Sequence, residues 1–155
     1  MIGDLAMRLL HAVVAGQISA APLPPEDLKS VACLAQNLWF ETRGSSETDK
    51  MAVANVVLNR VVDPRYPNDI CEVIWQPHQF SWTNDGKSDQ VRVMNPIDRA
   101  AWKRIVAISI DAVSGTLEDP TAGATHFHAT YVTPGWAQSL YRIVQIDQHI
   151  YYRYP

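Results

Sequence analysis

The feature of this sequence that most restricts its fold is a change in the spacing of apolar residues near residue 120. Before that point apolar residues recur every three to four positions, as on a helix with one buried face. After Asp119-Pro120 and Gly123 they alternate with polar residues, as in a strand. The sequence therefore predicts an α+β domain, with helices in the first two thirds and a small antiparallel sheet in the last third.

Start and stop signals define the individual elements. Prolines and capping residues open three long helices, and glycines or an Asp-Pro pair close them. Their expected ranges are about 26–43, 46–63 and 95–115. Ile97 is expected on the buried side of the third helix, and a helical turn is expected near 70–75. An irregular loop fills 77–95, and two further strands, 140–146 and 149–154, are joined at Asp147-Gln148.

Size and charge limit the classes of function. With 155 residues, we expect one domain, 23–155, preceded by a segment 1–22 that is either an amphipathic helix or a weak signal-like sequence. The net charge of -3, without a basic cluster, argues against nucleic-acid binding. No apolar run reaches the roughly 18 residues that a membrane span requires, so no stable membrane insertion is expected.

The two cysteines, Cys33 and Cys71, are too few for a disulfide scaffold, and their separation matches no zinc-ligand spacing. We therefore expect two buried thiols.

Glu41 is the strongest candidate for a catalytic acid. It falls on the last turn of the first helix, beside an apolar stripe that includes Leu38 and Trp39. Burial and the negative end of the helix dipole both disfavour a charged carboxylate, so the pKa of Glu41 should be raised. A carboxylic acid that is partly protonated near neutral pH can protonate the leaving oxygen of a glycosidic bond. From the helix pattern alone, an ordinary exposed glutamate at a helix end is the favoured interpretation.

The loop around residue 80 carries groups suited to binding sugars. Amide and hydroxyl groups of Gln79 and Ser81 can bond sugar hydroxyls, and the rings of Phe80 and Trp82 can stack on sugar faces. Alternatively, the two aromatic side chains hold the loop against the core, and for Phe80 the two interpretations are equally favoured.

Histidines suggest a competing chemistry. His126 and His128 lie on one face of a predicted strand, and His149 could add a third imidazole. Three histidines and a water would form a catalytic zinc site. The spacing of His126 and His128 is weak evidence for zinc, because histidines that only form hydrogen bonds within a small sheet are at least as common as zinc ligands.

Six blocks of the sequence together resemble one known family, the cell-wall hydrolases that include the spore-cortex-lytic enzymes. The blocks are NLWFETRG at 37–44, MAVANVVLNRV at 51–61, QFSW at 79–82, GATHFH at 123–128, VTPGWA at 132–137 and HIYY at 149–152. The resemblance spans about residues 28–154 in order, and it is much more specific than any single block.

The resemblance implies a lysozyme-like, lytic-transglycosylase-like fold and cleavage of peptidoglycan between N-acetylmuramic acid and N-acetylglucosamine. Glu41 matches the family's catalytic acid, which acts first as acid and then as base. The expected glycan-binding residues are Gln79, Phe80, Ser81, Trp82, His126 and His128. No cofactor or metal is expected. The alternatives are a zinc-dependent N-acetylmuramoyl-L-alanine amidase using His126, His128 and His149, and a wall-binding module gripping glycan through Trp82 and Trp136 without cutting it.

Two positions depart from the family pattern. Ser45 stands where the family has a second glutamate, and Asp147 stands where a glycine is expected. The remaining candidates for a second carboxylate are Glu47, Asp85 and Asp89, none of which the sequence places. A transglycosylase that uses one carboxylate fits this pattern better than a conventional lysozyme does.

Family members that act on spores usually carry a separate wall-binding module, for which this chain has no room, so we expect a bare catalytic domain. We also expect a monomer that acts on the bacterial cell wall, in the periplasm or outside the cell. One origin consistent with this is a phage endolysin, made in the host cytoplasm and released by a holin. A secreted bacterial remodelling enzyme is the other.

Overall fold

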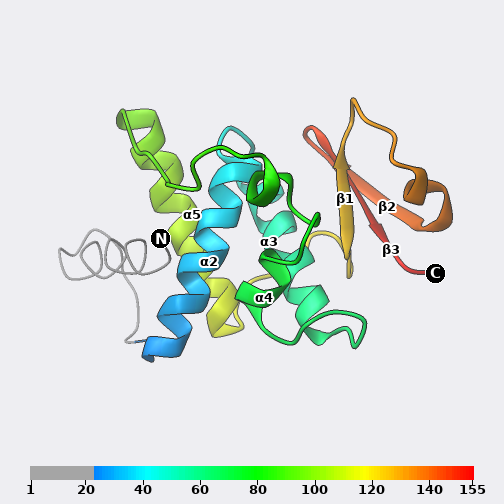
Figure 1. Ribbon diagram of the computed structural model, residues 1–155, viewed down its shortest axis with the longest axis horizontal. Coiled ribbons are helices and arrows are strands. Elements are labelled where there is room, and N and C mark those ends of the chain that lie inside the picture. The colour runs from blue at the N-terminus through cyan, green and yellow to red at the C-terminus, as the bar shows by residue number, and fades with distance from the viewer. Residues whose placement is uncertain (1–22) are drawn as a thin grey trace.

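The computed structural model describes residues 23–155, in which a group of helices carries a small sheet at one end (Figure 1). The segment 1–22, expected to be helical or signal-like, lies outside the described residues. The helices are α2 (Pro25–Thr42), α3 (Glu47–Val62), α4 (Ile70–Ile74) and α5 (Pro96–Ser114), with 3-10 helices η1 (Ser81–Asn84) and η2 (Gly135–Ser139). The strands are β1 (His126–Ala129), β2 (Tyr141–Ile146) and β3 (His149–Arg153). The α+β fold predicted from the apolar spacing is confirmed.

The helix ends follow the signals in the sequence. The Ser46 hydroxyl accepts a hydrogen bond from the backbone N–H of Asp49 and so caps the start of α3. Asn95 caps α5 in the same way through Asp98. Gly115 ends α5 with a φ of 78°, a left-handed conformation that glycine adopts without a Cβ clash. Local sequence therefore fixes where these helices begin and end.

The helix α2 packs against α3, α4 and α5, and the core lies between them. Leu34 and Leu38 of α2 and Ile105 of α5 are fully buried there. Ile97, which we expected on the buried side of α5, is instead 81% exposed. The buried residues of α5 begin only at Ile105, and the partly buried Ala101 and Trp102 are the first side chains of the helix to pack on the core. Ile97 lies on the turn before them and makes no such contact.

The expectation of two buried thiols is wrong, because Cys33 and Cys71 form a disulfide. Cys33 lies on α2 and Cys71 on α4, two helices that pack together and bring the two Cα atoms to 5.4 Å. That separation is within the usual range for a disulfide. The sequence separation of 38 residues did not reveal this contact, since it depends on how two distant helices pack.

The sheet has the strand order β1-β3-β2, with both pairs antiparallel. The predicted hairpin of the last two strands is confirmed, with its turn at Asp147-Gln148. Residues that pair directly project to the same side of the sheet. Phe127 is opposite Tyr151 on one side, and His126 is opposite Tyr152 on the other. Tyr151 is fully buried, so its side of the sheet faces the helices.

Candidate active site

Glu41 lies on the last turn of α2, where the chain turns into α3. The ammonium group of Lys50, on α3, donates hydrogen bonds to the carbonyl oxygens of Arg43 and Ser45, at 3.3 and 2.5 Å. A positive charge near the C-terminal end of a helix also interacts favourably with the helix dipole. The segment that carries Glu41 is thus held in place by the next helix.

A cavity of about 750 Å³ opens beside Glu41. Three parts of the chain form its wall: the end of α2, the loop that contains η1, and β1 with the residues that follow it. The lining residues are Phe40, Glu41, Arg60, Gln79, Phe80, Ser81, Trp82, Asp85, Lys87, Ser88, Phe127, His128, Ala129, Tyr131, Val132 and His149. A smaller depression of about 350 Å³ is lined by Glu41 and its neighbours in the chain, from Trp39 to Ser45. Glu41 therefore borders two hollows of the surface.

The pKa of Glu41 is raised to about 7, mainly because the carboxyl is buried. His149 acts in the opposite direction, and the nearby charge of Asp49 makes a smaller contribution that raises the pKa. The raised pKa follows the direction expected from the apolar neighbours of Glu41 on α2. Near neutral pH, a substantial fraction of Glu41 is protonated and available as an acid.

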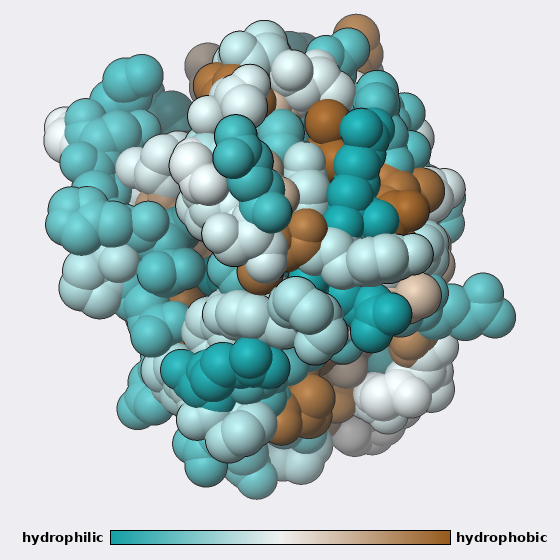
Figure 2. All heavy atoms as spheres, turned by 90° about the vertical axis from the view of Figure 1, so that its right-hand side faces the viewer, coloured by the Kyte–Doolittle hydropathy of each residue, from teal (hydrophilic) through white to brown (hydrophobic). Residues whose placement is uncertain are grey.

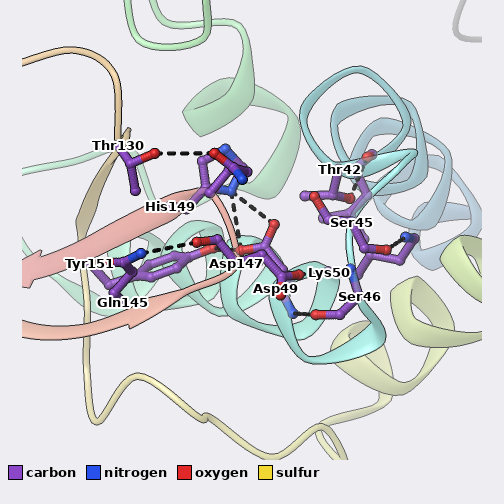
Figure 3. Close-up of polar contacts among 12 residues, drawn as sticks. Thr42, Ser45, Ser46, Asp49, Lys50, Thr130, Gln145, Asp147, His149 and Tyr151 are labelled. Carbon is purple, nitrogen blue, oxygen red and sulfur yellow. Dashed lines mark hydrogen bonds and ion pairs between the residues drawn. The ribbon is translucent and has the colours of Figure 1, made fainter.

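Asp49 is a buried acidic group that the sequence did not single out as functional. It is 0% exposed, yet it lies close enough to Glu41 to affect its pKa. Its carboxylate accepts hydrogen bonds from Nδ1 of His149 at 2.8 Å and from the Tyr151 hydroxyl at 2.6 Å. Figure 3 shows both side chains reaching from β3 to Asp49 on α3. In the sequence Asp49 is only the fourth residue of a capping box, and its partners come about 100 residues later.

Asp147, one of the two departures from the family pattern, has a structural contact beyond its own turn. Its φ is 49°, a left-handed conformation that aspartate tolerates in tight turns. Its carboxylate accepts a hydrogen bond from the backbone N–H of Ser46 at 2.9 Å. Asp147 therefore connects the hairpin to the start of α3.

The loop residues expected to bind sugar fall into two groups. Gln79 and Ser81 are exposed at the cavity, where their polar groups are accessible. Phe80 and Trp82 also border the cavity, but they are only 2% and 5% exposed. The indole N–H of Trp82 donates to Oδ1 of Asn37 at 2.8 Å, and its ring stacks on Phe40. For these two aromatic side chains, the main contacts are therefore with the core.

The three histidines of the proposed zinc site are not brought together. His149 shares a side of the sheet with Phe127 and Tyr151, whereas His126 and His128 project to the opposite side. The rings of His126 and His128 pack on Trp136 there. Within residues 23–155, no group of three His, Cys, Asp or Glu side chains is placed to hold a metal ion. A zinc site would need all three imidazoles within about 2 Å of one point.

His126 and His128 differ in their relation to the cavity. His128 borders it, with Nε2 hydrogen-bonded to the Tyr152 hydroxyl at 2.9 Å. His126 is not part of the cavity wall, and burial, with the charges of Arg60 and Arg65, lowers its pKa to about 4. The glycan-binding role expected for His126 thus has no support from its position.

The three candidates for a second carboxylate, Glu47, Asp85 and Asp89, do not all lie at the cavity that Glu41 borders. Asp85 borders the cavity and is exposed. Glu47 forms an ion pair with Arg104 of α5, and Asp89 is not part of the cavity wall. None of these three carboxyl groups has the buried position of Asp49.

Among the described residues, no helix is both long enough and apolar enough to cross a bilayer. Figure 2 shows the side of the molecule that carries the sheet as largely hydrophilic, with apolar atoms in small separate patches.

Two solved structures share this fold. The catalytic domain of the germination-specific lytic transglycosylase SleB from Bacillus anthracis has a TM-score of 0.64 and 26% identity, with 87% of this chain and 100% of that chain covered. The catalytic domain of the Bacillus cereus SleB protein has a TM-score of 0.63 and 26% identity, covering 86% of this chain and 95% of that one.

Sequence comparison finds similarity to spore cortex-lytic enzymes. The spore cortex-lytic enzyme of Halalkalibacterium halodurans is 35% identical over 119 residues, 76% of this chain but only 33% of that protein. The enzyme of Bacillus subtilis is 31% identical over 76% of this chain and 35% of its own length. This chain thus spans about a third of the length of these relatives. The model of the cell wall hydrolase family matches residues 44–152, beginning just after Glu41, and the chain belongs to the cell wall hydrolase family.

Proposed function

We propose that this chain cleaves the glycan strand of peptidoglycan between N-acetylmuramic acid and N-acetylglucosamine, as a lytic transglycosylase. The observation that carries the proposal is the placement of Glu41, a carboxyl in a cavity wall with its pKa raised to about 7. Similarity to the catalytic domain of a lytic transglycosylase supports the reaction type.

In this mechanism Glu41 serves twice. Its protonated form gives a proton to the glycosidic oxygen as the bond to muramic acid breaks. The hydroxymethyl oxygen of the same muramic acid then bonds to the exposed carbon, and its proton returns to the Glu41 carboxylate. The product is an internal anhydro sugar, and no water is consumed. A single carboxyl with a pKa near neutrality suits both steps, so the serine at position 45 does not prevent the reaction.

The polar residues of the cavity supply the proposed binding groups for the sugar. Gln79 and Ser81 would hydrogen-bond hydroxyl and N-acetyl groups, and His128 would border the bound strand. Tyr131, which is 83% exposed at the same cavity, offers a ring face that Phe80 and Trp82 do not. The chain would act on glycan strands as a monomer.

The disulfide supports a place of action at the cell wall. Disulfides persist in oxidising compartments, such as the periplasm and the extracellular space, and are rare in the cytosol. The bond between Cys33 and Cys71 therefore fits an enzyme that works outside the inner membrane.

Mass spectrometry of digested walls tests the proposed reaction. Purified peptidoglycan is incubated with the protein, and the soluble fragments are identified. We expect muropeptides that end in anhydro-muramic acid. Reducing sugar ends would indicate a lysozyme-type hydrolase instead, free stem peptides would indicate an amidase, and undigested walls with bound protein would indicate a binding module.

A further inference from the structure

His149 is held in a fixed orientation at the edge of the Glu41 cavity. Its Nδ1 atom lies 2.8 and 3.1 Å from the two carboxylate oxygens of Asp49. The edge of its ring packs against Phe127, with 5.0 Å between the ring centres. The side chain is 12% exposed and borders the same cavity as Glu41. Contacts on two sides thus fix the ring while part of it stays accessible to a bound sugar.

The contact with Asp49 determines which nitrogen of His149 is available. A carboxylate only accepts hydrogen bonds, so Nδ1 carries the proton in this pair. In a neutral imidazole the other nitrogen, Nε2, is then an acceptor. None of the hydrogen bonds among residues 23–155 involves this Nε2 atom. The cavity is therefore bordered by a basic nitrogen that has no hydrogen-bond partner in the part of the chain that the structure describes.

Asp49 itself is anchored from a second side. The Tyr151 hydroxyl donates to Oδ1 at 2.6 Å, and the whole side chain is 0% exposed (Figure 3). A buried aspartate behind a histidine fixes its tautomer and stabilises the imidazolium that forms when the histidine takes a proton. Glu41, Asp49 and His149 also affect one another electrostatically, so the three groups lie close together.

We propose that His149, oriented by Asp49, accepts the proton of the attacking hydroxymethyl group and passes it to Glu41. This step rests on the proposed transglycosylase function. As the glycosidic bond breaks, its oxygen takes the Glu41 proton. The muramic acid O6–H bond breaks and an O6–C1 bond forms, and the O6 proton moves to Nε2. The imidazolium then gives a proton to the Glu41 carboxylate. Both side chains return to their starting states, and no other reactant is needed.

The relay determines the dependence of activity on pH. The active form requires a protonated Glu41 and a neutral His149, so activity falls at high pH as Glu41 ionises. The titratable and charged groups that face His149 are Glu41 of α2, Asp49 of α3, Asp147 of the hairpin turn and Tyr151 of β3.

The substitution His149→Asn tests the role of Nε2 separately from that of Nδ1. The asparagine amide can still donate to Asp49 from the position of Nδ1, but nothing replaces Nε2. We expect the rate of muropeptide release to fall at least a hundredfold, in the range typical of a lost general base. Folding and binding to peptidoglycan should persist. The matched control is His78→Asn, at an exposed position whose φ of 62° suits asparagine.

A smaller loss of rate would overturn the relay. If His149→Asn does not fold, His149→Gln is the second variant, because its amide reaches the position of Nε2 but cannot take a proton. The same loss is expected there. Glu41→Gln in the same assay separates the two claims. If Glu41→Gln is inactive but His149→Asn is active, only the relay fails, whereas an active Glu41→Gln refutes the proposed function itself.

Discussion

At the residue level, sequence and structure agree on Glu41 but not on its surroundings. The position of Glu41 beside Leu38 on α2 indicated a raised pKa, since both residues belong to one helix, and the family resemblance favoured the catalytic interpretation over an ordinary exposed glutamate. Asp49 could not be recognised in the same way. Its burial depends on His149 and Tyr151, which reach it from a strand at the far end of the chain.

The raised pKa of Glu41 makes folding stability depend on pH. Because the folded state favours the protonated form, Glu41 contributes stability that is full below pH 4.5 and is lost as pH rises through about 7. The loss amounts to about 3 kcal/mol for a shift of this size. We expect Glu41→Gln, which cannot ionise, to gain up to that amount relative to the natural protein between pH 4.5 and 8.

Urea unfolding of both proteins at several pH values measures this difference. Glu72→Gln, an exposed glutamate on α4, serves as the control and should follow the natural protein. Parallel stability curves for the natural protein and Glu41→Gln would mean that Glu41 has an ordinary pKa.

Trp82 is expected to be more important for stability than for binding. Trp82→Ala removes a nearly buried ring and leaves Oδ1 of Asn37 without its donor. Truncation of a buried aromatic side chain typically costs about 3–5 kcal/mol. We expect a clear decrease in the melting temperature, and a smaller decrease for Trp82→Phe, which keeps the stacking on Phe40. A Trp82→Ala protein with normal melting but lost glycan binding would place Trp82 among the sugar-binding groups.

At the level of elements, local signals predicted most of the structure. Caps, prolines and glycines gave the ends of α3 and α5, and alternation gave the strands of the final hairpin. The errors concern packing between elements. The exposed Ile97 and the disulfide between Cys33 and Cys71 both depend on which helices are neighbours, and no local pattern contains that information.

The disulfide should contribute substantially to stability by linking α2 to α4. Closing a loop of 38 residues is worth about 4 kcal/mol in the chain-entropy model. We expect the double variant Cys33→Ala/Cys71→Ala to melt well below the natural protein. Dithiothreitol should lower the melting temperature of the natural protein towards that of the double variant, and should leave the double variant unchanged. Equal melting temperatures in all four samples would show that the bond is absent.

At the level of the whole molecule, the site exists only where the helices meet the sheet. Gln79 and Ser81 were predicted as site residues from their chemistry, and the fold places them at the same cavity as Glu41. The histidines show where sequence reasoning fails. Alternation along β1 correctly put His126 and His128 on one side, but the register of β3 places His149 on the other.

This arrangement leads us to expect activity without a metal ion. EDTA should leave the rate of wall lysis unchanged, because the three imidazoles needed for a zinc site project to two sides of the sheet. The measurement is the decrease in turbidity of purified walls, with and without chelator, alongside metal analysis of the protein. Stoichiometric zinc, with activity lost on chelation and restored by zinc, would favour the amidase alternative.

The most direct test of the proposed function is the rate of muropeptide release by Glu41→Gln, measured beside Glu72→Gln and the natural protein. The glutamine keeps the shape of the side chain but has no transferable proton, and loss of a general acid typically costs about a hundredfold to ten-thousandfold in rate. We expect a loss near the upper end of that range, with a normal circular dichroism spectrum, retained binding to walls and full activity of Glu72→Gln. A folded Glu41→Gln protein that keeps a tenth or more of the natural rate would contradict the assignment of Glu41 as the acid.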